Sequence, residues 1–302
     1  MPKTPDLPLA FRLLYESPIL RVRDYTCRAC QSGPGGEEYS DGNSIVLMRH
    51  GAFCKYFGRR VATADVNQAV FFSGRSTYRV SHPADCGDRG TTFVVSPRVL
   101  NDIVRELDPA VDERPDRPFP FVTGPCDTNT FWRHRAFVQR LESAQSDLQE
   151  PIWADVIALQ LVADILAAAF QCHALPSKRR RLGTDDDHAE RVEAAKTYLA
   201  SRLGERISLD EVARAVHLSP FHFARVFQAR TGVPVHRYFT RLRLRAALDR
   251  LMEGADDLTA LALELGFSSH SHFTDAFRAE FGRAPSRIRR STLRELSKNL
   301  EV

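Results

Sequence analysis

The chain of 302 residues has no long uninterrupted hydrophobic run. Its start lacks the basic residues and continuous apolar stretch that mark a secretory signal. The most apolar segment, residues 152–170, is interrupted by Asp155, Gln160 and Asp164. Because an aspartate near the centre of a bilayer costs about 3 kcal/mol, we expect a buried helix there, no membrane partner and a cytoplasmic protein.

Clustered metal ligands are also missing from the N-terminal part of the chain. Residues 8–122 contain only two histidines, His50 and His82, which are far apart in the sequence. A barrel that holds a catalytic metal needs several nearby histidines or carboxylates. This absence argues against a metalloenzyme, and we expect no catalytic residue, metal or other cofactor.

The six cysteines form one pattern, the CxxC of Cys27 and Cys30, while the others stand alone at positions 54, 86, 126 and 172. A CxxC can be a redox pair or half of a zinc site, but no second CxxC follows. Isolated cysteines in a cytosolic protein are commonly small buried hydrophobic residues. Two interpretations stay open: inert thiols, or a redox or metal sensor at Cys27 and Cys30.

The C-terminal third contains an internal repeat of apolar positions, with an offset of 49 residues that becomes 50 after one insertion. The first set is Leu209, Val212, Ala213, Val216 and Leu218, repeated as Leu258, Leu261, Ala262, Leu265 and Phe267. The second set is Phe223, Phe227 and Gly232, repeated as Phe273, Phe277 and Gly282. Each copy predicts a helix, a tight turn and a second helix, which is the layout of a helix-turn-helix.

In the first copy, Ser219 and Pro220 supply an N-cap and a first-turn proline for the second helix. With Phe223 and Phe227 turned inward, the helical period leaves other positions facing outward. These are Phe221, Arg225 and Gln228, with His222 at the edge. Arginine can read guanine and glutamine can read adenine in the major groove of double-stranded DNA, so we expect these residues to contact bases.

In the second copy, the corresponding expected base contacts are His270, Ser271, His272, Asp275 and Arg278. Expected phosphate contacts are Arg237, Arg241, Arg243, Arg283, Arg287, Arg289 and Arg290, with Arg245 also pointing towards the DNA backbone. Residues 234–252 join the copies and would be about 28 Å long as one helix. That length is close to the DNA repeat of about 34 Å, so both readers could enter successive major-groove segments.

The distribution of charge also points to the C-terminal third as the DNA-binding part. The net charge is only +4, but residues 189–302 contain 19 basic and 14 acidic side chains, against 23 and 24 in the rest of the chain. The positive excess therefore lies where a polyanion would bind.

The N-terminal part has a different pattern of apolar residues. Short apolar or alternating runs at residues 45–49, 53–57, 68–72, 78–81 and 91–95 are separated by polar or glycine-rich breaks, which predicts a β-sandwich or barrel. Two helices are expected at 127–145 and 149–172. The second is apolar on more than one side, so it must be covered either by its own barrel and a partner subunit or by intramolecular packing alone.

Residues from about 189 to 290 resemble the DNA-binding domain of the AraC/XylS family of bacterial transcription regulators. The strings "LSPFHFARVFQARTGVPVHRYFTRLRLRAAL" and "ALELGFSSHSHFTDAFRAEFGRAPSRIRR" carry this likeness. The resemblance implies base contacts by Phe221 and Arg225, and by His270, Ser271, His272 and Asp275. Asp275 departs from the family pattern, in which this position is often basic.

The segments "GGEEYSDGNSIVLMRHGAF" and "NQAVFFSG" resemble the cupin-like sensing barrel that many family members carry. The combined resemblance implies an α+β multidomain protein. Its parts are a barrel at 1–122, a helical dimerisation region at 123–172, a linker at 173–188, an all-α double helix-turn-helix domain at 189–291 and a tail at 292–302.

The same resemblance implies an effector-responsive regulator, more often an activator, and not an enzyme. Its implied partners are double-stranded DNA, a second copy of the chain, RNA polymerase and a small-molecule effector in the barrel, whose contact residues the sequence does not identify. Two rival classes stay open: a methyl-accepting repair regulator of the Ada type, which needs zinc on its cysteines, and a nucleoid-like protein, which binds DNA without sequence preference.

Overall fold

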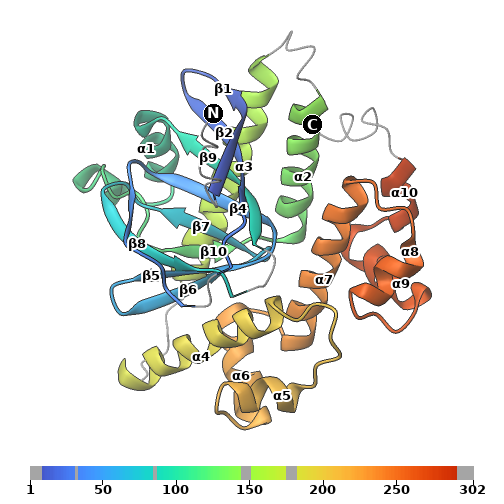
Figure 1. Ribbon diagram of the computed structural model, residues 1–302. Coiled ribbons are helices and arrows are strands. Elements are labelled where there is room, and N and C mark those ends of the chain that lie inside the picture. The colour runs from blue at the N-terminus through green and yellow to red at the C-terminus, as the bar shows by residue number, and fades with distance from the viewer. Residues whose placement is uncertain (1–8, 31–32, 84–86, 144–150, 175–181, 291–302) are drawn as a thin grey trace, which may run out of the picture.

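The computed structural model describes residues 9–30, 33–83, 87–143, 151–174 and 182–290. Strands dominate the first part of the chain, and helices make up the part from residue 182 onward (Figure 1). The predicted combination of a strand-rich N-terminal part and a helical C-terminal part is therefore confirmed.

The strands of the N-terminal domain are β1 (Leu9–Glu16), β2 (Leu20–Cys27), β3 (Glu38–Ser40), β4 (Ser44–His50), β5 (Phe53–Phe57), β6 (Arg60–Ala64), β7 (Gln68–Phe72), β8 (Ser76–Ser81), β9 (Asp88–Val95) and β10 (Thr123–Pro125). All five predicted runs are strands. β1, β2, β3, β6 and β10 were not predicted. In β1 and β2, charged residues such as Arg12 and Arg23 interrupt the apolar pattern that the prediction relied on.

Hydrogen bonding arranges these strands in two antiparallel sheets, with the orders β1-β2-β9-β4-β7-β10 and β3-β8-β5-β6. No pairing among the described residues joins the sheets, so the predicted closed barrel is not formed. One reason lies between β6 and β7, which follow each other in the chain but belong to different sheets. There the Asp65 carboxylate accepts from Asn67 N at 2.8 Å and the Asp65 carbonyl accepts from Gln68 N at 3.0 Å, so the chain turns sharply instead of continuing one ladder.

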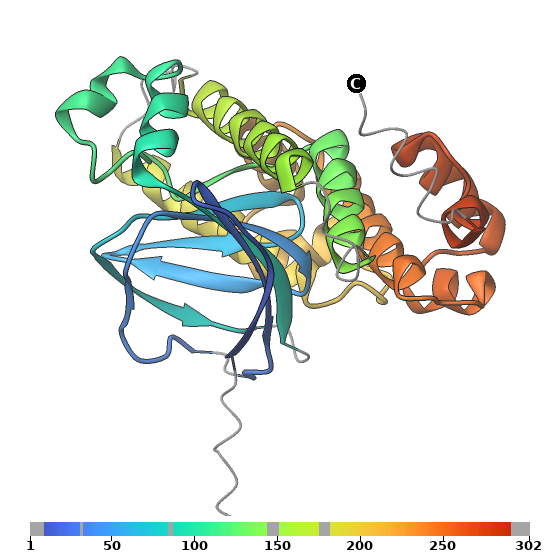
Figure 2. The same cartoon turned by 90° about the horizontal axis from the view of Figure 1, so that it is seen from above.

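The helices of this domain are α1 (Pro97–Arg105), the short 3-10 helix η1 (Pro109–Glu113), α2 (Thr128–Ser143) and α3 (Pro151–Ala174). The two predicted helices at 127–145 and 149–172 are thus confirmed as α2 and α3. α2 lies between the sheets and the C-terminal helices (Figures 1 and 2).

α3 is long and apolar enough to cross a membrane by length and composition. Its inner side nevertheless belongs to the core, where Leu161 and Val162 are fully buried. β10 packs closely on it, because a side chain at Gly124 would come within 2.6 Å of the Ala169 Cβ. The predicted buried helix is therefore confirmed for this side of α3.

The C-terminal helices are α4 (Leu182–Ala200), α5 (Leu209–Ala215), α6 (Pro220–Thr231), α7 (Val235–Met252), α8 (Leu258–Glu264), α9 (His270–Phe281) and α10 (Pro285–Arg290). The repeat gives two helix-turn-helix units, α5–α6 and α8–α9, joined by α7. α4 begins inside the segment expected to be a linker. Asp186 and Asp187 near its N-terminal end favour a helix there, because acidic side chains interact well with the positive end of the helix dipole.

Candidate nucleic-acid interface

The two units are built with the same local chemistry. Ser219 accepts a hydrogen bond from His222 N at the start of α6, and Ser269 accepts one from His272 N at the start of α9. Both second helices end at a glycine in the left-handed region, Gly232 at φ 75° and Gly282 at φ 72°. The predicted start of the helix now called α6, with Ser219 as N-cap and Pro220 in the first turn, is confirmed.

The turns inside the two units also correspond. His217 at φ 54° and Gly266 at φ 74° occupy equivalent positions, and both lie in the left-handed region. The turns close with equivalent backbone bonds, from Leu218 N to Ala213 O at 2.9 Å and from Phe267 N to Ala262 O at 3.0 Å. A glycine adopts this conformation at little cost, whereas the backbone of His217 is strained in it.

Paired phenylalanines fix which face of each second helix is turned inward. Phe223 and Phe227 are fully buried with ring centroids 5.5 Å apart, and Phe273 and Phe277 are fully buried with centroids 5.6 Å apart. These rings are core residues. Their burial leaves the opposite faces of α6 and α9 to solvent.

All nine expected base contacts lie on the outer faces or first turns of α6 and α9. Phe221, Arg225 and Gln228 are exposed on α6, with His222 half-buried at the edge, and His270, Ser271, His272, Asp275 and Arg278 are exposed on α9. Phe221 is 79% exposed, which is unusual for a large aromatic side chain.

Several of these side chains already have partners. The Nε2 atoms of His222 and His188 are 3.1 Å apart, and His272 Nδ1 lies 3.0 Å from the Ser268 hydroxyl. On α9 the Asp275 carboxylate is 3.7 Å from the Arg278 guanidinium, one helical turn away. The unusual acid on the second reader is therefore accompanied by a cation.

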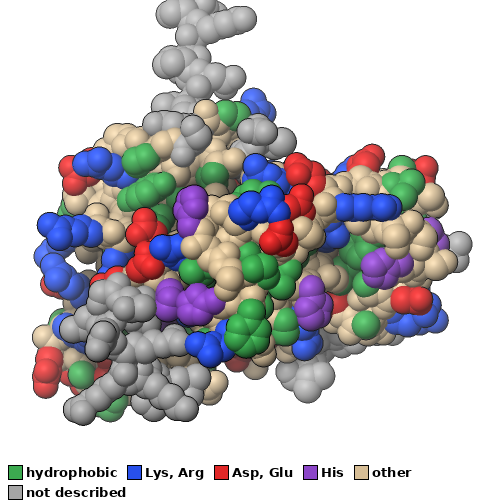
Figure 3. All heavy atoms as spheres, turned by 90° about the horizontal axis from the view of Figure 1, so that it is seen from below, with side chains coloured by type: hydrophobic (Ala, Val, Ile, Leu, Met, Phe, Trp, Pro, Cys, Tyr) green, Lys and Arg blue, Asp and Glu red, His purple; other side chains and the backbone are tan. Residues whose placement is uncertain are grey.

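A hollow of about 610 Å³ separates the two units. Its wall includes Gln228 from α6, His236 and Arg243 from α7, and His272 from α9. Among the described residues that line it there are two arginines and no carboxylate. Figure 3 shows the molecule from below, with histidine and arginine side chains next to exposed hydrophobic ones over the C-terminal helices. The described wall of the hollow therefore carries positive charge without negative charge.

The expected phosphate contacts differ in how accessible they are. Arg237 and Arg287 are exposed, and Arg283 lies 5.0 Å from the Trp132 ring centre. Arg241 is 3.1 Å from the Glu280 carboxylate, and Arg243 donates to the carbonyls of Leu203 and Glu205. The side chains of Arg289 and Arg290 lie outside the described residues.

Residues 212–291 match a family described as a helix-turn-helix domain. Over 255 residues the chain is 32% identical to the HTH-type transcriptional activator RhaS of Escherichia coli, and the alignment covers 84% of this chain and 87% of that protein. The chain belongs to the AraC/XylS family of transcription regulators.

Other relatives match over shorter lengths. The RhaS protein of Escherichia fergusonii is 29% identical over 165 residues, or 54% of this chain and 55% of the relative. With this relative and two Pectobacterium RhaS proteins, the chain spans about half the length of the curated relatives it matches. A crystal structure of unsaturated fatty acid bound ToxT from Vibrio cholerae aligns with 90% of this chain and 95% of that one, at 12% identity and a TM-score of 0.38.

In this AraC/XylS family member, α7 also contacts the sheet domain. Arg245 was expected to point towards DNA, but it is fully buried and donates to the carbonyls of Val66 at 2.6 Å and Cys126 at 3.0 Å. Tyr238 donates to the Asp65 carboxylate at 2.6 Å. The prediction for Arg245 was wrong because the side of α7 that carries this residue faces the N-terminal domain.

A buried carboxylate one turn further along α7 strengthens this contact. Asp249 is 1% exposed, and its oxygens lie 2.7 Å from Arg135 of α2 and 3.4 Å from Arg89 of β9. Burial lowers the pKa of Arg135, while the nearby Asp249 charge acts in the opposite direction. We call Arg89, Arg135, Arg245 and Asp249 the interdomain polar cluster. Sequence reasoning missed it because its members are brought together only by the docking of the two domains.

Proposed function

We propose that this protein is a sequence-specific DNA-binding transcription regulator whose helices α6 and α9 enter successive segments of the major groove. The observation that carries the proposal is the matched pair of helices. Each buries two phenylalanines, exposes the residues expected to read bases, and contributes a side chain to the hollow between the units. Such short exposed helices suit the width of the major groove.

On α6, Arg225 reads a guanine and Gln228 an adenine, because their donors and acceptors match those base edges. On α9, Asp275 accepts from a cytosine amino group, while Arg278 remains close enough to offset the charge that Asp275 brings near the phosphates. The exposed ring of Phe221 makes an apolar contact with a thymine methyl group.

Among the arginines, Arg237 and Arg287 contact phosphates directly, since both are exposed. Arg241 and Arg243 add positive charge from half-buried positions, and Arg243 also holds the 203–205 segment in place. Contacts by Arg283, Arg289 and Arg290 complete the proposed phosphate set.

The two-sheet domain is proposed as a cupin-like sensing domain for a small-molecule effector, in a cytoplasmic regulator without enzymatic activity. Effector binding would shift the population of domain arrangements, and activation through RNA polymerase is the proposed outcome. We propose a homodimer formed through α3, on which Ile152 and Val156 are 74% and 58% exposed on one face. Exposed apolar residues one helical turn apart favour a partner helix there.

Substitution of two arginines separates base reading from phosphate contact. Arg225→Ala is expected to weaken binding to the specific site by about 1 to 3 kcal/mol and to relax one base position. Arg237→Ala is the matched control, expected to weaken binding to all sequences alike and to reduce the salt slope by about one. Equal loss by Arg225→Ala on specific and random fragments, measured by titration at fixed salt, would contradict the base-reading role.

A further inference from the structure

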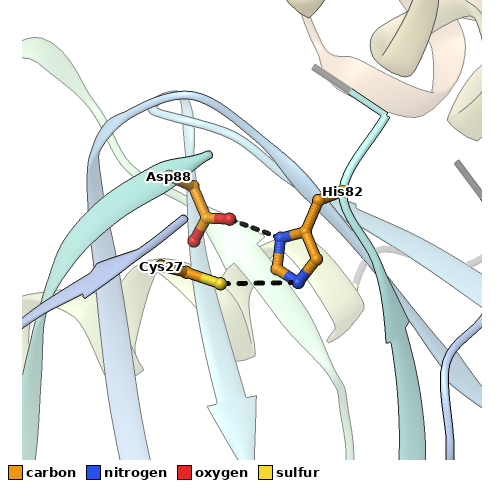
Figure 4. Close-up of side chains that lie close together, drawn as sticks. All are labelled: Cys27, His82 and Asp88. Carbon is orange, nitrogen blue, oxygen red and sulfur yellow. Dashed lines mark hydrogen bonds and ion pairs between the residues drawn. The ribbon is translucent and has the colours of Figure 1, made fainter. Parts of the chain in front are cut away.

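Three reactive side chains from separate parts of the sequence meet at one end of the N-terminal sheets (Figure 4). Cys27 is the last residue of β2, and Asp88, the first residue of β9, is its partner in the strand register. His82 directly follows β8. Pairing of β2 with β9 brings the thiol next to the carboxylate, and the imidazole of His82, which is 55 residues after Cys27 and six before Asp88, lies beside both. The site is remote from the proposed base-reading residues in the chain and is independent of the proposed function.

The three side chains are arranged in series. Asp88 Oδ2 is 2.6 Å from His82 Nδ1, and His82 Nε2 on the other side of the ring is 3.7 Å from Cys27 Sγ. The Asp88 and His82 side chains are only 1% and 9% exposed, so this geometry is held by packing. A carboxylate that orients an imidazole, which in turn faces a nucleophile, is the arrangement that activates thiols and hydroxyls in many enzymes.

The charge on His82 provides a proton donor beside the sulfur. The hydrogen bond with Asp88, followed by the contact with Cys27, raises the pKa of His82 to about 10. The imidazole is therefore a cation at neutral pH and carries a proton on Nε2, facing the sulfur. That proton is available to a group that leaves during a reaction at the sulfur.

Access to Cys27 limits what can react there. The residue is 6% exposed, but the chain reaches the surface immediately afterwards, where Arg28 and Cys30 are exposed. Cys27 therefore lies next to the exposed end of the strand, and its low exposure favours a small reagent over a bulky one. The Asp88 carboxylate is bonded to His82 Nδ1, which leaves Nε2 as the ring atom that faces the sulfur.

We propose that Cys27 is a modification site for hydrogen peroxide, with His82 as its proton donor and Asp88 as the residue that positions His82. The thiolate sulfur attacks one peroxide oxygen, so that an S–O bond forms and the O–O bond breaks. The sulfur is oxidised to a sulfenic acid and the peroxide is reduced. The departing hydroxide takes the proton from His82 Nε2 and leaves as water, which balances both atoms and charge.

The test exposes the reduced full-length protein to hydrogen peroxide for set times, removes the peroxide with catalase, and then unfolds the protein in the presence of dimedone, so that trapping of sulfenic acid does not depend on access. Peptide mass spectrometry then locates the label. Cys27 is expected to be labelled at least tenfold faster than Cys172, an exposed thiol in the same molecule that serves as the internal control. His82→Gln and Asp88→Asn are each expected to slow labelling of Cys27 about tenfold while leaving Cys172 unchanged. Asp88→Asn keeps the size of the side chain, so it tests the charge in a protein that retains its fold, as circular dichroism would verify.

Three results would overturn the proposal. One is a Cys27 rate no greater than that of Cys172, and another is an unchanged Cys27 rate in both folded variants. The third is one tightly held zinc per chain, lost in Cys27→Ser, with a thiol that peroxide reaches only after chelation. That result would make the cluster a metal site instead.

Discussion

At the scale of single residues, buried charged groups determine how this protein responds to pH. Lys55 is 4% exposed, its ammonium group donates to the Phe71 carbonyl at 2.8 Å, and it lies 3.8 Å from the centre of the Phe72 ring. One carbonyl and an aromatic face replace only part of the hydration that a free ammonium group has. Burial accordingly lowers the pKa of Lys55 to about 7.

Lys55→Met is expected to stabilise the protein most below pH 7. There the folded state holds a buried charge that the unfolded chain solvates freely. Between pH 7 and about 10.5 the unfolded state binds more protons than the folded state, so this penalty fades as pH rises. The gain in unfolding free energy should therefore be a few kcal/mol at pH 6.5 and small at pH 10. It would be measured by denaturant titration of both proteins, and a gain that is the same at both pH values would contradict this account.

His82 is expected to titrate in the opposite sense. Its pKa is raised to about 10, so the stability that it contributes is fully present below about pH 6.5 and is lost as pH rises towards 10. Asp88→Asn removes the charge that holds the proton. NMR titration of the imidazole should then show the His82 pKa moving down towards its ordinary value. An unchanged His82 pKa in this variant would mean that Asp88 is not the cause.

The sequence allowed single residues to be predicted correctly where the helical repeat of one segment determines which side chains are exposed. The exposure of Arg225 and Asp275 follows from the inward phenylalanines of the same helix, so one segment contains all the needed information. Prediction failed for His82, which follows β8 of one sheet and meets Cys27 of β2 in the other sheet. Neither spacing nor composition records how the two sheets pack, and the histidine looks isolated in the sequence.

At the scale of elements, α7 is both the spacer between the two helix-turn-helix units and the contact with the sheet domain. The helix is buried on several sides, and its sequence contains a pattern that indicates this. Leu244, Ala246 and Ala247 add apolar positions beyond a single stripe, which indicates a helix covered from more than one direction. The identity of the covering domain lies in distant parts of the chain, so the polar partners of Arg245 could not be predicted.

The interdomain polar cluster gives an element-scale prediction. Asp249→Ala leaves the buried Arg135 without its carboxylate partner and is expected to lower the unfolding free energy by about 3 to 5 kcal/mol. Arg250→Ala, a neighbouring change in an ion pair whose side chains are 40% and 54% exposed, should cost less than about 1 kcal/mol. Denaturant unfolding of both variants makes the comparison.

A double variant provides the control for this prediction. Replacing both partners with apolar residues, in Arg135→Met with Asp249→Leu, removes the unpaired charge and should regain much of the lost stability. Equal and small losses for Asp249→Ala and Arg250→Ala would show that the cluster does not hold the domains together.

At the scale of the whole molecule, the fold places the sheet domain and the two helix-turn-helix units around one helix, α7. The sequence predicted the α+β composition, the repeat and the two helices α2 and α3, because each depends on short-range periodicity. It did not predict that the strands would form two sheets, or that α7 would dock on them through buried charges. Both depend on long-range pairing. This docking limits how freely α6 and α9 can move relative to the sheets.

The central claim is that one subunit reads two successive segments of the major groove. The most direct measurement is selection of genomic fragments by the full-length protein at near-physiological salt, followed by footprinting of those bound best. The account predicts paired elements in which each subunit protects two base-specific patches about one helical turn apart. Uniform recovery of all fragments, with affinity falling equally with salt on each, would contradict it and would instead indicate binding without sequence preference.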